Sequence, residues 1–119
     1  MLTDAPMPDF KRGDVVRVPF PYTDRNTRQH RPALVVSPGR IGENGELLWV
    51  VMITSAANRP WPADIPLRDQ YAQAGLPAPS VIRPVKLATI EARQAQCIGQ
   101  IDASVMHAVA RAFSRYLGG

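Results

Sequence analysis

Residues 47–54, with the sequence LLWVVMIT, form an almost wholly apolar run in a chain of 119 residues. Alternating strands show one polar face, whereas a run that is apolar at nearly every position is typical of a strand buried on both faces. Gly42 and Gly45 precede the run and provide turn residues at its start. We therefore expect residues 47–54 to be a strand at the centre of a sheet.

Other short runs rich in β-branched residues lie on both sides of this segment. The 12 prolines and 8 glycines are spread along the chain and separate these runs, which is typical of a small β protein. Pro66 limits one run to a sheet edge or a bulge, and Gly99 suggests a bulge in the last. The expected strands are residues 14–19, 33–37, 63–67, 80–84, 86–91 and 96–101.

The C-terminal segment changes its period from two to about four. Apolar side chains recur at Val105, Val109, Phe113 and Leu117, which is the spacing of one helix face. Asp102 or Ser104 can cap the start of this helix, and Gly118 can end it. The pattern predicts a helix over residues 102–117, whose apolar stripe either covers an end of a small barrel or forms a dimer contact.

The fold class that follows is mainly β, with five or more strands in a small barrel and a C-terminal α-helix. A length of 119 residues suits one domain, so we expect residues 1–119 to form a single unit. Pro6 and Pro8 indicate that residues 1–10 are an extended N-terminal tail.

Charge and cysteine content exclude several classes of protein. The chain has 14 Lys and Arg against 10 Asp and Glu, a formal charge of +4 that favours an acidic partner, either nucleic acid or protein. Cys97 is the single cysteine, so an internal disulfide is excluded, and with only His30 and His107 to join it no zinc site is expected. Its apolar neighbours predict a buried core position. No run is long enough to span a membrane, and we expect a cytoplasmic protein.

A basic segment separates the first two expected strands. It carries Arg25, Arg28, His30 and Arg31, with Asp24 as the one acidic residue among them. Positive charge concentrated beside a rigid strand favours contact with phosphate groups.

Arg31 and Thr54 form the most informative pair of polar residues. Sequential strands are usually neighbours, and in an antiparallel pair the start of one lies beside the end of the next. Arg31 begins the second strand and Thr54 ends the central one, so both are expected at one rim. A guanidinium can hold two phosphate oxygens and a threonine hydroxyl a third, which together suit a phosphodiester. Taken singly, Arg31 is better explained as an exposed charge near a strand end, and Thr54 as a β-branched residue that satisfies a turn. Only the pairing of the two favours a functional role.

Five fragments in this order resemble the MazF/PemK family of toxins from toxin–antitoxin modules. They extend over residues 11 to 117, and they are residues 13–16 (GDVV), 31–37 (RPALVVS), 51–55 (VMITS), 80–84 (SVIRP) and 98–101 (IGQI). The resemblance implies an SH3-like barrel with a C-terminal helix, usually a homodimer. It also implies a metal-independent and cofactor-free endoribonuclease that cleaves single-stranded RNA and is neutralised by an acidic antitoxin.

The same resemblance implies roles for individual residues. Arg31 matches the family's arginine before proline, and it would stabilise the pentacoordinate phosphate and can serve as an acid. Thr54 matches the threonine after the apolar strand and would position the same group, with Ser55 and His30 as possible support. Residues 22–30 lack the Gly-Ser-Glu type of loop found in many relatives, so the cleavage sequence does not transfer.

Further RNA contacts follow from loop position. Arg25 and Arg28 would bind the RNA backbone. Tyr22 and Trp61 flank the proposed rim, and each either stacks on an unpaired base or packs against the barrel.

Two other functions are compatible with the same barrel. A non-enzymatic toxin that binds DNA gyrase, as CcdB-like proteins do, depends on an aromatic C-terminal end, whereas this chain ends with residues 116–119 (YLGG). A barrel that binds RNA or protein without cleaving it is the other alternative.

Overall fold

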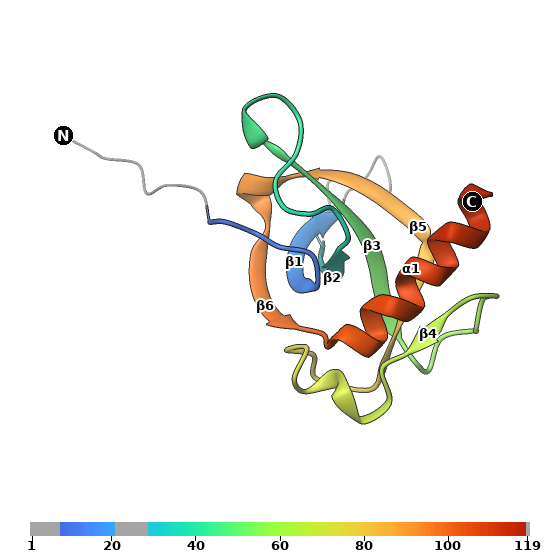
Figure 1. Cartoon of the computed structure of the whole chain (residues 1–119). Coiled ribbons are helices and arrows are strands. Elements are labelled where there is room, and N and C mark those ends of the chain that lie inside the picture. The colour runs from blue at the N-terminus through green and yellow to red at the C-terminus, as the bar shows by residue number, and fades with distance from the viewer. Residues whose placement is uncertain (1–7, 21–28, 119) are drawn as a thin grey trace.

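The computed structural model of the chain describes residues 8–20 and 29–118. Six antiparallel strands form one sheet, in the order β4-β5-β3-β2-β1-β6. The sheet curls into a half-barrel, and helix α1 lies across it (Figure 1). The expected mainly β fold with a C-terminal helix is therefore confirmed. The elements are β1 (Asp14–Phe20), β2 (Gln29–Val35), β3 (Leu47–Ser55), β4 (Ile65–Pro66), β5 (Ser80–Glu91), β6 (Gln96–Gln100), α1 (Ala103–Leu117), and the 3-10 turns η1 (Glu43–Gly45), η2 (Arg68–Tyr71) and η3 (Ala92–Gln94).

Strand β3 is the interior strand that its apolar sequence predicts, because it pairs with β2 on one side and β5 on the other. Its side chains alternate between two buried clusters. Val50 and Met52 join the cluster that contains Phe10, whereas Val51 and Ile53 join the cluster that contains residues of α1. We call these two sides of the sheet the Phe10 face and the helix face.

Strand β5 is one long element where the sequence predicts two strands. Its pairing with β3 shifts between Val51, opposite Leu87, and Met52, opposite Arg83, so residues 84–86 bulge out of the ladder. Pro84 has no N–H to donate and falls in this bulge. The proline that divides the sequence pattern thus bends the strand without ending it.

The boundaries of β2 also differ from the prediction of 33–37. The strand begins at Gln29, because residues 29–32 pair with β1 despite their polar sequence. It ends at Val35, because the N–H groups of Val36 and Ser37 both point to the carbonyl of Trp49, at 2.9 and 3.4 Å. The bulge expected near Gly99 is present, since Ile98 lies unpaired between Cys97 and Gly99 in the β1–β6 ladder.

One expectation about burial is wrong, and one residue of the expected tail packs in the core. Phe10, the last residue of the expected tail 1–10, is buried in the core, whereas residues 1–7 lie outside the described part of the chain. Cys97 was predicted to be buried in the core, but it is exposed on β6, the last strand at one edge of the sheet. Successive side chains of a strand point to opposite faces, so Ile98 packs against the core while Cys97 does not.

Helix α1 begins and ends at the residues that can cap it. The Asp102 carboxylate accepts the N–H of Val105 at 3.1 Å, and Gly118 closes the helix with a left-handed φ of 78°. Val105, Val109 and Ala112 are buried, whereas Leu117 is 83% exposed. The apolar stripe therefore packs on the sheet only over its first three turns. Of the helices in the described ranges, none has the length and apolar character needed to cross a membrane.

Candidate active site

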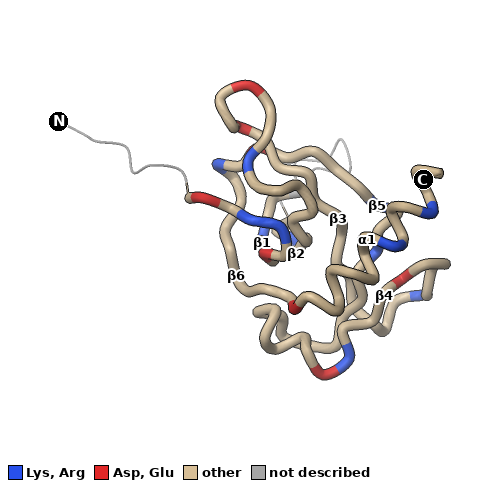
Figure 2. The backbone as a smooth tube through the Cα atoms, viewed as in Figure 1, with Lys and Arg blue, Asp and Glu red and all other residues tan. Residues whose placement is uncertain are grey.

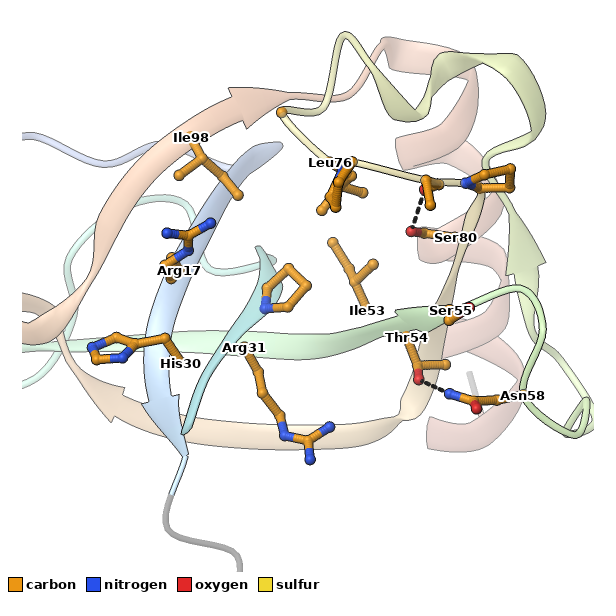
Figure 3. A pocket seen from close by; sticks show the side chains of 15 residues that line it. Arg17, His30, Arg31, Ile53, Thr54, Ser55, Asn58, Leu76, Ser80 and Ile98 are labelled. Carbon is orange, nitrogen blue, oxygen red and sulfur yellow. Dashed lines mark hydrogen bonds between the residues drawn. The ribbon is translucent and has the colours of Figure 1, made fainter. Parts of the chain in front are cut away.

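Arg31 and Thr54 lie together at one end of the sheet, as antiparallel pairing predicts. The β2–β3 ladder runs from Val35, opposite Val50, to Ala33, opposite Met52, and Arg31 and Thr54 lie two residues beyond its last pair. Both residues line the same two cavities. Both side chains belong to the Phe10 face, by alternation from Ala33 and Met52. Figure 3 shows the guanidinium and the hydroxyl pointing to the same side of the sheet.

The neighbouring residues His30 and Ser55 belong to the other face. Alternation places them with Leu34 and Ile53, which pack toward α1. His30 is adjacent to Arg31 in the chain and Ser55 is adjacent to Thr54, so the sequence alone suggests that all four residues belong together. The strands separate them into two pairs on opposite sides of the sheet edge.

A cleft of about 520 Å³ runs past this edge and is lined by both pairs. Pro32, Ile53, Leu76 and Ile98 form its apolar walls, and Arg17 and His30 lie at its rim (Figure 3). Arg17 was not singled out from the sequence; its place in an alternating strand, with the charge outward, is the signal that marks it.

A smaller cavity on the Phe10 face is lined by Arg31, Thr54, Arg83 and Lys86. Counted over both cavities, the cationic lining residues are Arg17, Arg31, Arg83 and Lys86, and no carboxylate from the described ranges lines either one. The charge of Arg83 is compensated by Asp64, and the other cationic groups of these walls suit an anionic ligand. Elsewhere the charges are mixed: basic segments lie on the C-terminal half of α1 and acidic ones on the loop before β3 (Figure 2).

Asn58 is a polar residue of the site that the sequence did not indicate. Its side-chain amide donates a hydrogen bond to the Thr54 hydroxyl over 2.6 Å. The Arg31 guanidinium donates to the side chain of Gln29 over 2.9 Å, at the exposed start of β2. Only the turn-forming character of asparagine marked residue 58 in the chain, and that property does not distinguish a site from a loop.

A buried ion pair fixes the loop that carries Asn58. The Arg83 guanidinium donates to both carboxylate oxygens of Asp64, at 3.0 and 3.1 Å, and to the carbonyl of Arg59 at 2.9 Å. The paired side chains are only 9% and 8% exposed. Trp61 lies under the guanidinium, with its ring centroid 4.2 Å away.

The loop between η2 and β5 forms the other wall of the cleft. Leu76 and Ala74 are buried, and the loop lies directly against β6. An added Cβ at Gly99 would overlap the Ala74 carbonyl, and one at Gly75 would overlap the backbone of Ile98. Glycine is therefore required at both positions for the wall to stand where it does.

The remaining expected RNA-contacting residues divide into two groups. Tyr22, Arg25 and Arg28 lie outside the described residues. Trp61 is half-buried and stacks against Arg83, and Lys86 Nζ lies 5.2 Å from the same ring. The contact of Trp61 with RNA remains a prediction.

The arrangement defines what the site can do chemically. A guanidinium fork and a hydroxyl on one face can hold the oxygens of a tetrahedral or pentacoordinate phosphate. Within residues 8–20 and 29–118, no group of three His, Cys, Asp or Glu side chains is placed to hold a metal ion.

Comparison with known proteins gives one family match. A sequence model of the family described as "PemK-like, MazF-like toxin of type II toxin-antitoxin system" matches residues 11–117, nearly the whole chain. None of the curated proteins compared with the chain matches it.

Solved structures share the fold at low sequence identity. MazF from Deinococcus radiodurans superposes with a TM-score of 0.71 at 23% identity, over 93% of this chain and 98% of that one. A MazE-MazF complex from the same organism gives 0.69 at 23% identity, over 92% and 96%. A mycobacterial endoribonuclease in complex with its cognate antitoxin gives 0.65 at 17% identity, over 91% and 92%.

Proposed function

Because this chain belongs to the PemK-like, MazF-like toxins of type II toxin–antitoxin systems, we propose that it is an endoribonuclease that cleaves single-stranded RNA without a metal ion. The observation that carries the proposal is the placement of Arg31 and Thr54 on one face of neighbouring strands, beside an open cleft. A mycobacterial protein with the same fold is described as an endoribonuclease, which supports the activity.

In the proposed reaction the ribose 2′-oxygen attacks the adjacent phosphorus, and the bond to the 5′-oxygen breaks. The 2′-hydroxyl loses a proton and the 5′-oxygen gains one, so the products are a 2′,3′-cyclic phosphate and a 5′-hydroxyl, and no water is consumed. Negative charge accumulates on the non-bridging oxygens as phosphorus becomes pentacoordinate. Donors fixed where that charge develops lower the barrier, and this is the role of Arg31 and Thr54.

The cleft face contributes binding in this proposal. Arg17 and His30 stand at the rim, where they would contact the RNA backbone beside the scissile phosphate. The apolar wall around Pro32 and Ile53 offers a surface for an unpaired base. His30 lies on the opposite face of β2 from Arg31, so we assign it to binding and Ser55 to the loop turn, where it accepts the N–H of Ala57 at 3.1 Å.

We further propose that the protein acts in the cytoplasm as a homodimer and that an acidic antitoxin neutralises it. Two of the solved structures with this fold are toxin–antitoxin complexes, and the formal charge of +4 suits an acidic partner. Trp49 and Leu87 are 50% and 55% exposed, which supports a contact between two copies.

Incubation of the purified protein with single-stranded RNA in EDTA tests the activity. We expect cleavage with cyclic-phosphate ends, and Arg31→Ala should reduce the rate at least about 100-fold because a charged donor to the transition state is lost. Arg93→Ala is the matched control, since Arg93 is an exposed arginine on η3. Intact RNA across varied sequences would reject the proposal, with gyrase-dependent DNA breaks or RNA binding without products identifying the alternatives.

A further inference from the structure

We propose that Asn58 is a positioning residue that orients the Thr54 hydroxyl toward the scissile phosphate. This inference rests on the proposed function, because it assigns a catalytic use to the Thr54 hydroxyl. The observation that carries it is the 2.6 Å hydrogen bond in which the Asn58 amide donates to Thr54 Oγ1.

The direction of this hydrogen bond decides what Thr54 can do. A hydroxyl has one proton and two acceptor lone pairs, and its proton rotates to suit its surroundings. When Asn58 occupies one lone pair, the hydroxyl proton is turned away from the amide. The proton is then available to a ligand oxygen in the small cavity that Thr54 and Arg31 both line.

The backbone around Asn58 is held tightly enough for this orientation to persist. Its N–H donates to the carbonyl of Ser55 at 3.1 Å, and the carbonyl of the next residue, Arg59, accepts from the buried Arg83 at 2.9 Å. Asp64, which pairs with Arg83, also accepts the N–H of Trp61 at 2.9 Å. The short turn from Thr54 to Asn58 is thus fixed at both ends, by β3 and by the ion pair.

Asparagine is the residue type that suits this position. Its amide donates without carrying a charge, so it does not compete with Arg31 for the phosphate. Aspartate has nearly the same shape but only accepts, so it would draw the Thr54 proton toward itself and away from the substrate. The pair Asn58→Ala and Asn58→Asp therefore separates loss of the hydrogen bond from its reversal.

Single-turnover RNA cleavage tests the inference. Asn58→Ala should lower the rate constant about five- to tenfold with little change in KM, because one neutral hydrogen bond is lost. Asn58→Asp should be slower still and should gain a new pH dependence from the carboxylate. Gln94→Ala removes an exposed amide on η3 and is the matched control.

A double-mutant cycle shows whether Asn58 acts through Thr54. In a Thr54→Val background the Asn58→Ala substitution should have no further effect, because the hydroxyl to be oriented is absent. An equal fall in both backgrounds, or an unchanged rate in Asn58→Ala alone, would overturn the inference while wild-type cleavage persists. Failure of the proposed function gives a different result, because the wild-type protein itself then leaves RNA intact. In that case the inference about Asn58 is rejected together with the proposed function.

Discussion

The two loops that wall the cleft are fixed by opposite means. The loop from Ala56 to Asp64 is held by charge, through the buried Arg83–Asp64 pair and the ring of Trp61. The loop that carries Gly75 is held by shape, because its backbone touches that of β6 at Gly99 and its Leu76 side chain is buried. The first wall depends on one charged pair, and the second depends on two glycines that let the backbones touch.

Each wall is therefore disrupted by a different kind of substitution. A buried ion pair adds little net stability while intact, but removing one partner leaves an uncompensated charge in the interior. A close backbone contact has no charge to expose, but it leaves no volume for one added methyl group. The wall held by charge also carries Asn58, so its failure reaches the Thr54 hydroxyl directly.

The largest expected effect is on the wall held by charge. Asp64→Ala leaves the Arg83 guanidinium buried without its carboxylate and should lower the free energy of unfolding by about 3–5 kcal/mol, measured by urea denaturation. The control is Asp9→Ala, because the Asp9–Arg40 pair spans 3.7 Å and Asp9 is 97% exposed. That control should change stability by about 0–1 kcal/mol, and similar losses in both variants would contradict the assignment.

The wall held by shape should respond less strongly. Gly99→Ala places a methyl group against the Ala74 carbonyl, so we expect a loss of about 1–3 kcal/mol and weaker RNA binding as the wall moves outward. Gly118→Ala tests backbone conformation alone, since Gly118 has a φ of +78° and no heavy atom within 4 Å of an added Cβ. If Gly118→Ala changes RNA binding as much as Gly99→Ala does, the collision is not the cause.

The smallest effect concerns the start of α1, close to the second wall. The Ser104 hydroxyl and the Val105 N–H donate to Asp102 and lower its pKa from 3.8, with a contribution from Gln70 of η2. Because the folded state has the lower pKa, this stabilisation is present above pH 3.8 and is lost as pH falls below it. Asp102→Ala should lower Tm by a few degrees at pH 7 and by less at pH 3.

An asparagine at the same position separates the cap from the charge. Asp102→Asn keeps an acceptor for the Val105 N–H and should retain most of the stability with a flatter pH dependence. A thermal stability that falls with acid equally in both proteins would show that Asp102 is not the group responsible.

Much of the fold and the central pair of the site were predictable from sequence. The apolar run at residues 47–54 predicted the interior strand, and the pairing of β2 with β3 predicted the shared cavities that Arg31 and Thr54 line. The first inference uses the periodicity of apolar residues within one segment. The second uses the tendency of sequential strands to be neighbours.

The contacts that fix the site were not predictable. Arg83 reaches Asp64 over 19 positions, and it stands directly before the bulge at residues 84–86, where the pairing of β5 shifts. Cys97 was wrongly placed in the core because its apolar neighbours in the sequence do not show that β6 is the last strand of the sheet, where Cys97 is exposed. Periodicity carries no information about such bulges and edges, which depend on the curl of the whole sheet.

The pairing of β2 has a consequence for how such a protein can evolve. Arg31 is fixed by its partner Val18 on β1 and by the register that leads from Ala33 to Met52. Insertions or deletions among residues 21–28 change the preceding segment without altering which way Arg31 points. One residue inserted between Arg31 and Ala33 would instead exchange the faces of Arg31 and His30. The number of residues before β2 can therefore change in evolution without moving Arg31, whereas a residue added within positions 31–33 would turn Arg31 away from Thr54.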